Sequence, residues 1–388
     1  MRKIFALALA VPVLAAPSTL LATPAAAVES CQGRTATIVG TDGDDDLRGT
    51  LLADVVVLGP GDDVFHARGG DDVVCGGGGK DRVFGGEGGD ALDGGGGADN
   101  LRGEAGDDQV RGGPGDDILR GGADNDLVRA AGGADLVLEA AGDDQVTGGT
   151  GKDTLSYQES ATAITTDWGS GFVDGAGHDS VGHVESLLGS TLADVLRGSA
   201  AADRLAGGGG ADQVFGFGGA DLLRVSSGEA RGGVGNDTFV VVRTGTALGE
   251  GGNDRFVMRS GTSRGGVGRD LFQVLAKGGG TADGGRAADV LSFEEVLRGV
   301  TASLTTGTAT WGDRLVRFDR VEVLFGSRRG DRLTGTARGD YLKGLGGDDL
   351  LRGLGGNDLL VGDRGFDRGE GGPGGDVCVT EVQVACEA

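Results

Sequence analysis

Four nearly identical nine-residue units lie close together in the chain: GGGGKDRVF at 76–84, GGEGGDALD at 85–93, GGGGADNLR at 94–102 and GGPGDDILR at 112–120. Each unit starts with a glycine-rich stretch, has aspartate at its sixth position and has an apolar residue at its eighth. The phase extends well beyond these units. From Asp45 to Asp153 every ninth residue is aspartate, thirteen in all, and the residue two further on is always apolar. Such a period predicts a solenoid built from one repeated structural unit.

The unit divides into a turn and a strand. Its last three residues alternate outward, inward and outward, as in a short strand, so that the apolar eighth residue fills the interior. The six residues before them predict a turn, in which glycine permits positive φ and exposes backbone carbonyls. The aspartate adds a carboxylate. Carbonyl and carboxylate oxygens are the ligands that calcium takes in proteins, so the turns are candidate calcium sites.

These units resemble the G-G-x-G-x-D-x-U-x nonapeptide of hemolysin-type (RTX) calcium-binding proteins, in which U is a large apolar residue. The stretch CQGRTATIVGTDGDDDL from Cys31 is similar to the start of Sec-exported calcium-binding repeat proteins of high-GC Gram-positive bacteria. The resemblance implies an all-β fold, a right-handed parallel β-roll in which two units make one coil. Aspartates eighteen residues apart would then stack along one edge, Asp63, Asp81, Asp99 and Asp117 on one side and Asp72, Asp90, Asp108 and Asp126 on the other.

The resemblance also implies several calcium ions, bound between successive turns, and folding that depends on them. Without the ions, stacked carboxylates repel one another, and a thin core cannot offset the conformational entropy of so much glycine. The expected metal ligands are Asp45, Asp63, Asp72, Asp81, Asp90, Asp99, Asp108, Asp117, Asp126, Asp153, Asp212, Asp221, Asp237, Asp254, Asp340, Asp349 and Asp358, with Gly76, Gly85, Gly94 and Gly112.

Some turns depart from the pattern. GTLLAD at 49–54, AAGGAD at 130–135, EAAGDD at 139–144 and GSAAAD at 198–203 each lack some of the expected glycines. We expect their aspartates to be structural rather than full ligands, so that not every unit corresponds to one ion.

The nine-residue step stops after Leu155, resumes at Asp194 and returns from Asp331 to Asp376. In the looser stretch before 292, aspartates follow one another at intervals close to one coil, which predicts glycine turns on one edge and ordinary turns on the other. Two similar spacers, with LSY and VESLLGS in one and LSF and VEVLFGS in the other, predict β-rich coils without calcium turns.

The expected organisation is a signal peptide at 1–27, an N-terminal cap at 28–39, array 1 at 40–156, spacer 1 at 157–188, array 2 at 189–292 (degenerate after 224), spacer 2 at 293–325, array 3 at 326–379 and a C-terminal cap at 380–388.

The start of the chain has the features of a secretory signal. Arg2 and Lys3 precede an apolar run, and Ala25, Ala26 and Ala27 form a small-residue cleavage site. We therefore expect a secreted, extracellular protein. Four cysteines in an exported chain indicate disulfides, with three possible pairings. We favour Cys31–Cys75 and Cys378–Cys386, which would clip the two ends of the array, over free thiols.

The formal net charge of −24 and the 84 glycines restrict the classes of partner. An acidic chain repels nucleic acid and anionic membranes and attracts cations. No segment after the leader is apolar enough to span a bilayer, so no membrane insertion is expected. A cell-surface or extracellular-matrix partner is possible on this sequence, although no motif identifies it.

No pattern in the chain predicts an enzyme. His178 and His183 lack further ligands for a metal site, and GTSRG at 261–265 matches a serine-hydrolase motif without its strand–turn–helix context. The tripeptides at 329–331 and 338–340 spell a cell-adhesion signal but are explained by an arginine before an obligatory Gly-Asp step. Trp168 and Trp311 are expected to pack in the spacers. The predicted function is calcium binding, and the alternative is a calcium-stiffened adhesion or matrix module.

Overall fold

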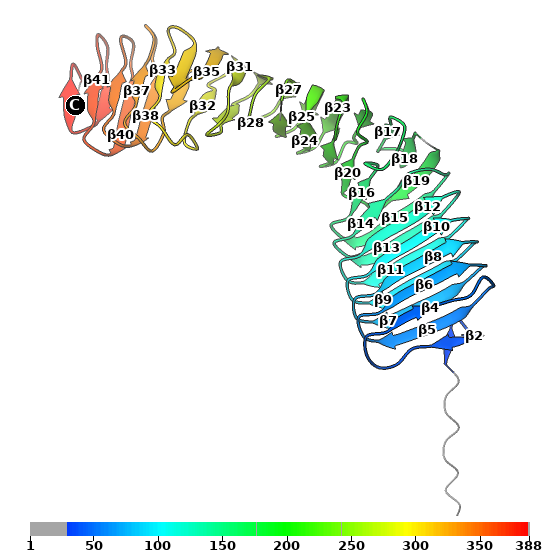
Figure 1. The fold of residues 1–388 in the computed structure, drawn as a ribbon. Coiled ribbons are helices and arrows are strands. Elements are labelled where there is room, and N and C mark those ends of the chain that lie inside the picture. Colours follow the sequence, from blue (N-terminus) through cyan, green and yellow to red (C-terminus); the bar gives the residue numbers. More distant parts are fainter. Residues whose placement is uncertain (1–28, 176, 242, 387–388) are drawn as a thin grey trace, which may run out of the picture.

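The computed structural model describes residues 29–175, 177–241 and 243–386. In these residues the chain forms only strands, turns and bends, wound into a long curved β-roll of about 19 coils (Figure 1). The expected signal peptide and the first residue of the expected N-terminal cap lie outside the described residues. No helix long and apolar enough to cross a membrane occurs in the described part of the chain.

Each coil contributes one strand to each of two sheets, and within each sheet neighbouring strands pair across coils. The first sheet contains, in spatial order, β3 (Ile38–Val39), β5 (Val55–Pro60), β7 (Val73–Gly78), β9 (Ala91–Gly96), β11 (Gln109–Pro114), β13 (Leu127–Gly133), β15 (Gln145–Gly151), β19 (His178–Gly182), β18 (Phe172–Asp174), β17 (Thr165–Asp167), β21 (Val195–Arg197), β23 (Ala211–Gly218), β25 (Ser227–Val234), β27 (Thr246–Gly251), β29 (Thr262–Val267), β31 (Gly280–Arg286), β35 (Arg314–Asp319), β34 (Thr308–Trp311), β33 (Thr301–Ser303), β37 (Arg332–Thr334), β39 (Leu350–Arg352), β41 (Arg368–Glu370) and β43 (Val382–Val384).

The second sheet is parallel throughout. Its strands are β4 (Asp46–Arg48), β6 (Val64–Gly69), β8 (Arg82–Glu87), β10 (Asn100–Ala105), β12 (Ile118–Ala123), β14 (Leu136–Leu138), β16 (Thr154–Ser156), β20 (Ser186–Leu188), β22 (Arg204–Ala206), β24 (Leu222–Val225), β26 (Thr238–Val241), β28 (Arg255–Met258), β30 (Leu271–Val274), β32 (Val290–Ser292), β36 (Val323–Phe325), β38 (Tyr341–Gly346), β40 (Leu359–Arg364) and β42 (Val377–Val379).

The register confirms the expected β-roll. In array 1, Val64 pairs with Arg82 and Leu101 with Leu119, so one coil takes two nonapeptides. The strands are longer than expected, however. The strands β5 to β12 each cover the last three residues of one unit and the first three of the next, as in β8, because the leading residues, mostly glycine, also join the parallel ladder. The turn proper is reduced to positions four to six of the unit.

The interior of the roll is one residue wide at each strand. The eighth residue of each unit is buried, as in Val83, Leu92, Leu101 and Leu119, except for the partly buried Leu47 in the first unit. The first residue of the unit also points inward. This first position is nearly always glycine because it faces the turn aspartate. The core is therefore continuous along the roll but thin across it.

Between residues 222 and 292 the core becomes larger. Phe239, Phe256 and Phe272 stack with ring centroids 4.8 Å apart, the spacing of adjacent strands. In the same sheet, β24, β26, β28 and β30 each bury a second apolar residue, such as Val241 or Met258. Aromatic stacking and added apolar burial stabilise these coils without metal turns on both edges. Only one edge keeps stacked aspartates in this section.

The two spacers insert extra strands into one sheet only. In spacer 1, β17, β18 and β19 form an antiparallel meander between β15 and β21, while the other sheet passes from β16 to β20 and β22. At strand spacings of about 4.8 Å, two additional strands lengthen one sheet by about 10 Å. The roll bends where this meander lies (Figure 1). Spacer 2 has the same design, with β33, β34 and β35.

The tryptophans pack in these meanders. Trp311 is buried, contacts Phe293 edge to face and donates its indole N–H to the Ala276 carbonyl at 3.4 Å. Trp168 is partly buried against the core.

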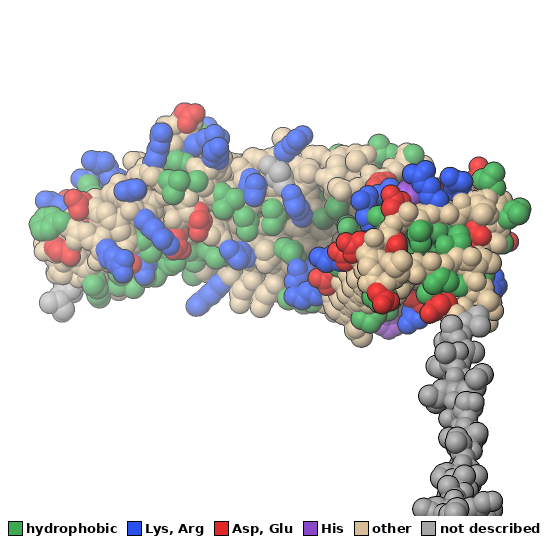
Figure 2. All heavy atoms as spheres, turned by 60° about the horizontal axis from the view of Figure 1, so that its bottom comes forward, with side chains coloured by type: hydrophobic (Ala, Val, Ile, Leu, Met, Phe, Trp, Pro, Cys, Tyr) green, Lys and Arg blue, Asp and Glu red, His purple; other side chains and the backbone are tan. Residues whose placement is uncertain are grey.

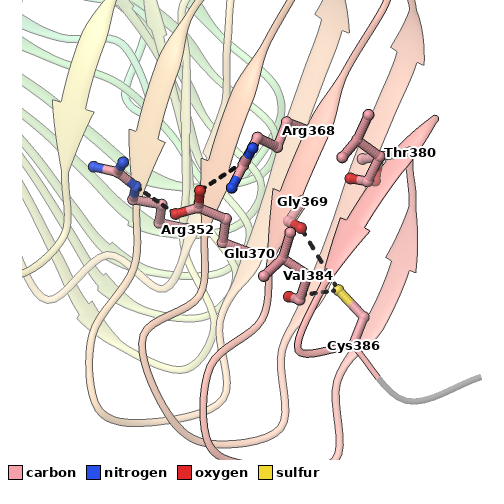
Figure 3. A network of polar contacts seen from close by, with 8 residues as sticks. Arg352, Arg368, Gly369, Glu370, Thr380, Val384 and Cys386 are labelled. Carbon is pink, nitrogen blue, oxygen red and sulfur yellow. Dashed lines mark hydrogen bonds and ion pairs between the residues drawn. The ribbon is translucent and has the colours of Figure 1, made fainter.

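Both ends of the roll are closed by the predicted disulfides. Cys31, in the hairpin of β1 (Ser30–Cys31) and β2 (Arg34–Thr35), bonds to Cys75 in β7. At the other end Cys378 bonds to Cys386. Figure 3 shows this end, where Glu370 accepts hydrogen bonds at 2.8 Å from both Arg352 and Arg368 and the sulfur of Cys386 lies 3.4 Å from the Val384 carbonyl oxygen.

The two disulfides should differ in their contribution to stability. Cys31–Cys75 spans 44 residues and Cys378–Cys386 spans 8. Loop-closure entropy then predicts losses of about 4 and about 2.5 kcal/mol when each is removed. We expect the double variant Cys31→Ser/Cys75→Ser to have the lower free energy of unfolding in urea at saturating calcium. Cys378→Ser/Cys386→Ser is the control, and equal losses would contradict the entropic account.

Candidate metal centre

The turn aspartates form two ladders, one along each edge of the roll. One carboxylate oxygen, Oδ1, accepts the backbone N–H of the aspartate one coil earlier. Asp81 does so from Asp63 at 3.0 Å, and Asp90 from Asp72 at 2.8 Å. The ladders therefore bring together the aspartates that the sequence placed on each side. This bond orients every carboxylate in the same way.

The second carboxylate oxygen, Oδ2, has no partner in most turns. It is buried and accepts no hydrogen bond, although a buried carboxylate oxygen without a donor is strongly unfavourable. The turns with this feature are those of Asp63, Asp72, Asp81, Asp90, Asp99, Asp108, Asp117, Asp126, Asp135, Asp153, Asp212, Asp221, Asp237, Asp254, Asp270, Asp289, Asp349, Asp358, Asp367 and Asp376.

The unpaired oxygen points into a gap that glycine leaves open. A β-carbon on Gly94, the first residue of its unit, would lie 2.8 Å from the Gly112 carbonyl oxygen and closer still to Oδ2 of Asp99. The same arrangement surrounds Gly76, whose β-carbon would lie 2.5 Å from Oδ2 of Asp81 and close to the Gly94 carbonyl oxygen. Carboxylate and carbonyl oxygens thus converge from two successive coils, which is the donor set that a hard divalent cation takes. The residues present fit calcium.

The backbone at the second position explains why Oδ2 lacks a donor. In every one of these turns this residue has positive φ, whether or not it is glycine. Eight of these residues are not glycine and have φ between 69° and 86°: Arg68, Glu104, Ala131, Phe217, Glu250, Leu345, Leu354 and Asp363. The left-handed region costs an ordinary residue roughly 1–2 kcal/mol. A turn that holds such residues in this conformation needs a compensating interaction.

A second kind of turn has serine or threonine at the second position. Here the backbone is not left-handed, and its N–H donates to Oδ2 of the turn aspartate at 2.6–2.7 Å. In five of the six, the hydroxyl also donates to the carboxylate. The pairs are Thr41–Asp45, Thr50–Asp54, Ser190–Asp194, Ser199–Asp203, Ser327–Asp331 and Thr336–Asp340. They occupy the first two turns of each of the three arrays, one on each edge.

The structure therefore separates the predicted ligands into two groups. Asp45 and Asp340 lie in threonine turns, where Oδ2 accepts both the N–H and the hydroxyl of the threonine, which does not favour these aspartates as ligands. The other fifteen predicted aspartates have an unpaired Oδ2, and Gly76, Gly85, Gly94 and Gly112 line the gap. Asp54 and Asp203, expected to be structural, accept hydrogen bonds from the N–H groups of Thr50 and Ser199. Asp135, also expected to be structural, instead has an unpaired Oδ2.

Five further aspartates share the unpaired geometry but were not among the predicted ligands: Asp135, Asp270, Asp289, Asp367 and Asp376. For Asp270 and Asp376 the signal was present, since GGVGRD at 265–270 and GGPGGD at 371–376 are complete turns. For the other three, alanine or aspartate replaces a leading or middle glycine. The left-handed second position, which tolerates alanine and aspartate, could not be seen in the sequence.

The spacers extend the ladders with other residues. Glu185 and Glu322 take the aspartate position and accept the N–H of Asp153 and Asp289. Asp179 accepts the N–H of Asp144, and its second oxygen accepts the Tyr157 hydroxyl at 2.6 Å. Carboxylates of the spacers thus continue the ladders. Glu381 closes one ladder at the C-terminal end in the same manner.

The motifs set aside in the sequence analysis lie in unsuitable surroundings. Ser263 is buried within β29, so it is not an exposed nucleophile at a turn. His178 is exposed, stacks on Phe172 and contacts Asp174 at 2.5 Å; neither it nor His183 belongs to a group of three or more potential ligands in the described residues. Asp331 and Asp340 are buried in turns, where a receptor could not read the tripeptides.

The net charge overstates the acidity of the surface. All fourteen turn aspartates of arrays 2 and 3 are buried, and lysine and arginine side chains gather on this C-terminal part in Figure 2. Acidic side chains are denser over array 1 in this view. The exclusion of nucleic acid on overall charge alone stays a prediction.

Burial shifts the titration of the turn carboxyls. Removal from water raises the pKa of Asp108 and Asp117 to about 7 and that of Asp126 and Asp349 to about 8. The hydrogen bond from the preceding coil opposes this shift, and repulsion from carboxylates of the same row adds to it. A neutral or cation-bound carboxyl is therefore the favoured state in these turns.

Comparison with known proteins supports this geometry. The model of the RTX calcium-binding nonapeptide repeat, which describes four copies of the unit, matches residues 39–74, 48–83, 76–110, 84–119, 102–137, 140–157, 188–223 and 334–369. No curated protein gives a significant match. Among solved structures, the extracellular lipase LipA from Serratia marcescens is 18% identical, with a TM-score of 0.20, over 56% of this chain and 38% of the lipase. This chain thus spans well under half of the lipase, and so weak a similarity supports no argument about activity.

The raised pKa values predict an unusual pH response of the metal-stripped protein. A carboxyl with a raised pKa in the folded state stabilises the fold below its unfolded pKa near 4, and this stability is lost as the pH rises through about 6–8. Without calcium, we expect the circular dichroism signal of β-structure to be larger at pH 5 than at pH 8.

With calcium present, protons compete for the same oxygens, so the calcium midpoint should rise as the pH falls. Sedimentation at each pH would exclude aggregation as the source of the signal. A metal-stripped chain that is equally folded at pH 5 and pH 8 would contradict this reading of the turns.

Proposed function

Since this chain belongs to the RTX calcium-binding nonapeptide repeat proteins, we propose that it is an extracellular protein whose roll folds when calcium fills its turns. The observation that carries the proposal is the row of buried, unpaired Oδ2 atoms along both edges. Each belongs to a turn in which carbonyl oxygens of the next coil face the same gap. A divalent cation there would satisfy these oxygens and neutralise the repulsion along the row.

The magnitudes support folding coupled to calcium. A site filled at ten times its dissociation constant adds about 1.4 kcal/mol. About ten such sites would contribute ~14 kcal/mol, as much as the whole stability of an ordinary domain. Extracellular modules bind calcium at roughly 10⁻⁴–10⁻³ M. Such a chain would remain unfolded at the low free calcium of a cell and fold after export.

The serine and threonine turns add an order to this folding. Their aspartates are satisfied by the chain, so the first coil of each array forms its turns without calcium. These coils provide a template on which the next, calcium-dependent coil can stack. Folding within an array would then proceed from its N-terminal coil, with the two edges starting together.

The two disulfides support an extracellular location, because such bonds persist in oxidising compartments and are rare in the cytosol. The expected leader at 1–27 agrees with this proposal. A non-catalytic role is part of the proposal, because the same geometry repeats in many turns. Many equivalent turns suit many ion sites, whereas an active site is a single place.

The first test is a calcium titration of residues 28–388 from metal-stripped protein. We expect a cooperative rise in the circular dichroism signal of β-structure near millimolar calcium, with a concurrent change in the fluorescence of Trp168 and Trp311, which pack in the spacers. Magnesium is the control, because its small, rigid coordination shell fits such turns poorly. A chain already folded without calcium would show that the ion is not needed for folding.

The second test compares two turns of the same array. Asp99 has an unpaired Oδ2, whereas Oδ2 of Asp54 accepts the Thr50 N–H at 2.7 Å. We expect Asp99→Ala to reduce the stability gained between chelator and saturating calcium by about 1.4 kcal/mol, the contribution of one site. Asp54→Ala should leave this gain unchanged, even where it lowers stability under both conditions. Equal changes in the gain would show that the two kinds of turn do not differ in binding.

A further inference from the structure

One turn of array 1 belongs to neither kind. In the unit at 139–147, the first position is Glu139 where the other units have glycine or a small or apolar residue, and the second position, Ala140, is not left-handed. Glu139 directly follows β14, and its backbone N–H donates to the Ser156 carbonyl at 3.0 Å. The inward direction of the first position sends its carboxylate into the gap that glycine otherwise leaves open.

The Glu139 carboxylate is buried with no partner. The residue is 1% exposed, and neither Oε1 nor Oε2 takes part in a hydrogen bond. Asp126, one coil earlier on the same edge, adds a second unpaired oxygen. Burial, together with repulsion from Asp144, Asp126 and Asp179, raises the pKa of Glu139 well above its usual range. An arrangement of this kind requires either protons or a cation.

The three carboxyl groups lie close enough for one cation. Charge repulsion, and no hydrogen bond, links Glu139 to Asp126 and Asp144. Asp126, Glu139 and Asp144 each offer a ligand oxygen, and these oxygens all lie within 4.8 Å of one another. Two oxygens bound to one calcium ion at roughly 2.4 Å can be separated by up to about 4.8 Å. The three oxygens therefore lie at the spacing of ligands around one ion.

We propose that Asp126, Glu139 and Asp144 form a three-carboxylate calcium site that holds its ion more tightly than the ordinary turns do. The choice of calcium among divalent cations rests on the proposed function, whereas the site itself rests on these three residues. A third carboxylate raises the charge facing the ion by one unit, and ligand charge is a main determinant of calcium affinity.

The position of the site gives it a structural consequence. Asp144 donates its N–H to Asp179 of β19, which accepts the Tyr157 hydroxyl, so the cluster lies where array 1 meets spacer 1. Figure 1 shows the roll begin to bend next to β14 and β15, between which the turn lies. An ion retained here would fix the last coil of array 1 against the spacer while other turns exchange calcium.

The experiment compares residues 28–388 with the variants Glu139→Gln and Glu139→Gly. Glutamine keeps the size of the side chain and removes its charge, and glycine restores the residue typical of the repeat. Asp143→Asn is the matched control, since it removes one charge from the same turn at an exposed residue outside the cluster. Bound calcium is counted by equilibrium dialysis at buffered free calcium, and unfolding by urea is followed in chelator and at saturating calcium.

At a free calcium concentration tenfold below the folding midpoint, the unaltered chain and Asp143→Asn should retain one ion that both Glu139 variants lose. At saturating calcium, Glu139→Gln should be less stable, by about 1.4 kcal/mol for a tenfold loss of affinity. If Glu139 were only a buried, unpaired charge, Glu139→Gln would change the stability in the opposite direction. Removal of the charge would then stabilise the fold and lower the calcium concentration at the folding midpoint.

Either the absence of an early ion from the unaltered chain or its retention in Glu139→Gly would overturn the proposal. Both results can occur while the cooperative calcium transition persists, so they leave the proposed function intact. A chain that folds without calcium but still loses one bound ion on replacement of Glu139 would contradict the proposed function and support the three-carboxylate site.

Discussion

A buried carboxylate oxygen without a hydrogen-bond donor is the constraint on which this roll depends. Each ordinary turn directs one oxygen of its aspartate to the preceding coil and leaves the other unpaired inside the turn. In an interior of low dielectric constant, such an oxygen is tolerated only when a proton or a cation accompanies it. Because the arrangement repeats at both edges, the proposed calcium-coupled folding would make the stability of the whole roll depend on the occupancy of its turns.

The chain satisfies this constraint in different ways along its length. In the first coil of each array, serine or threonine supplies the missing donors, as Ser327 does for Asp331. In spacer 1, the Tyr157 hydroxyl does so for Asp179. In the later part of array 2, one edge has no aspartate ladder, and the stack of Phe239, Phe256 and Phe272 supplies apolar burial in its place. Turns with an unpaired Oδ2 are thus interspersed with parts of the roll that side-chain donors or apolar packing stabilise.

The spacers also set the shape of the molecule. Each adds two strands to one sheet and none to the other, and a parallel roll cannot absorb this difference without bending. The bend is thus set by the inserted strands and does not depend on the occupancy of the turns.

The period of aspartate and apolar residues predicted a solenoid with a carboxylate in each turn, because a strictly repeated unit has few ways to bury its one apolar residue. The resemblance to the hemolysin-type nonapeptide implied the all-β roll, its eighteen-residue coil and the two stacked edges. The ligands expected on these grounds include most of the aspartates with an unpaired Oδ2. Cysteine positions favoured the pairing that the structure has.

Three features depend on the conformation of the folded turns and on contacts between coils, and they could not be predicted from the repeat. The N–H of Thr41 or Thr336 reaches its aspartate because the second residue of that turn is not left-handed. Asp45 and Asp340 therefore have hydrogen-bond donors, although they stand at the ninth-residue spacing of the expected ligands. Left-handed residues such as Ala131 complete turns that seemed too poor in glycine. Glu139 approaches Asp126 only because coils eighteen residues apart stack, and a contact made by stacking is a property of the folded roll and not of any single unit.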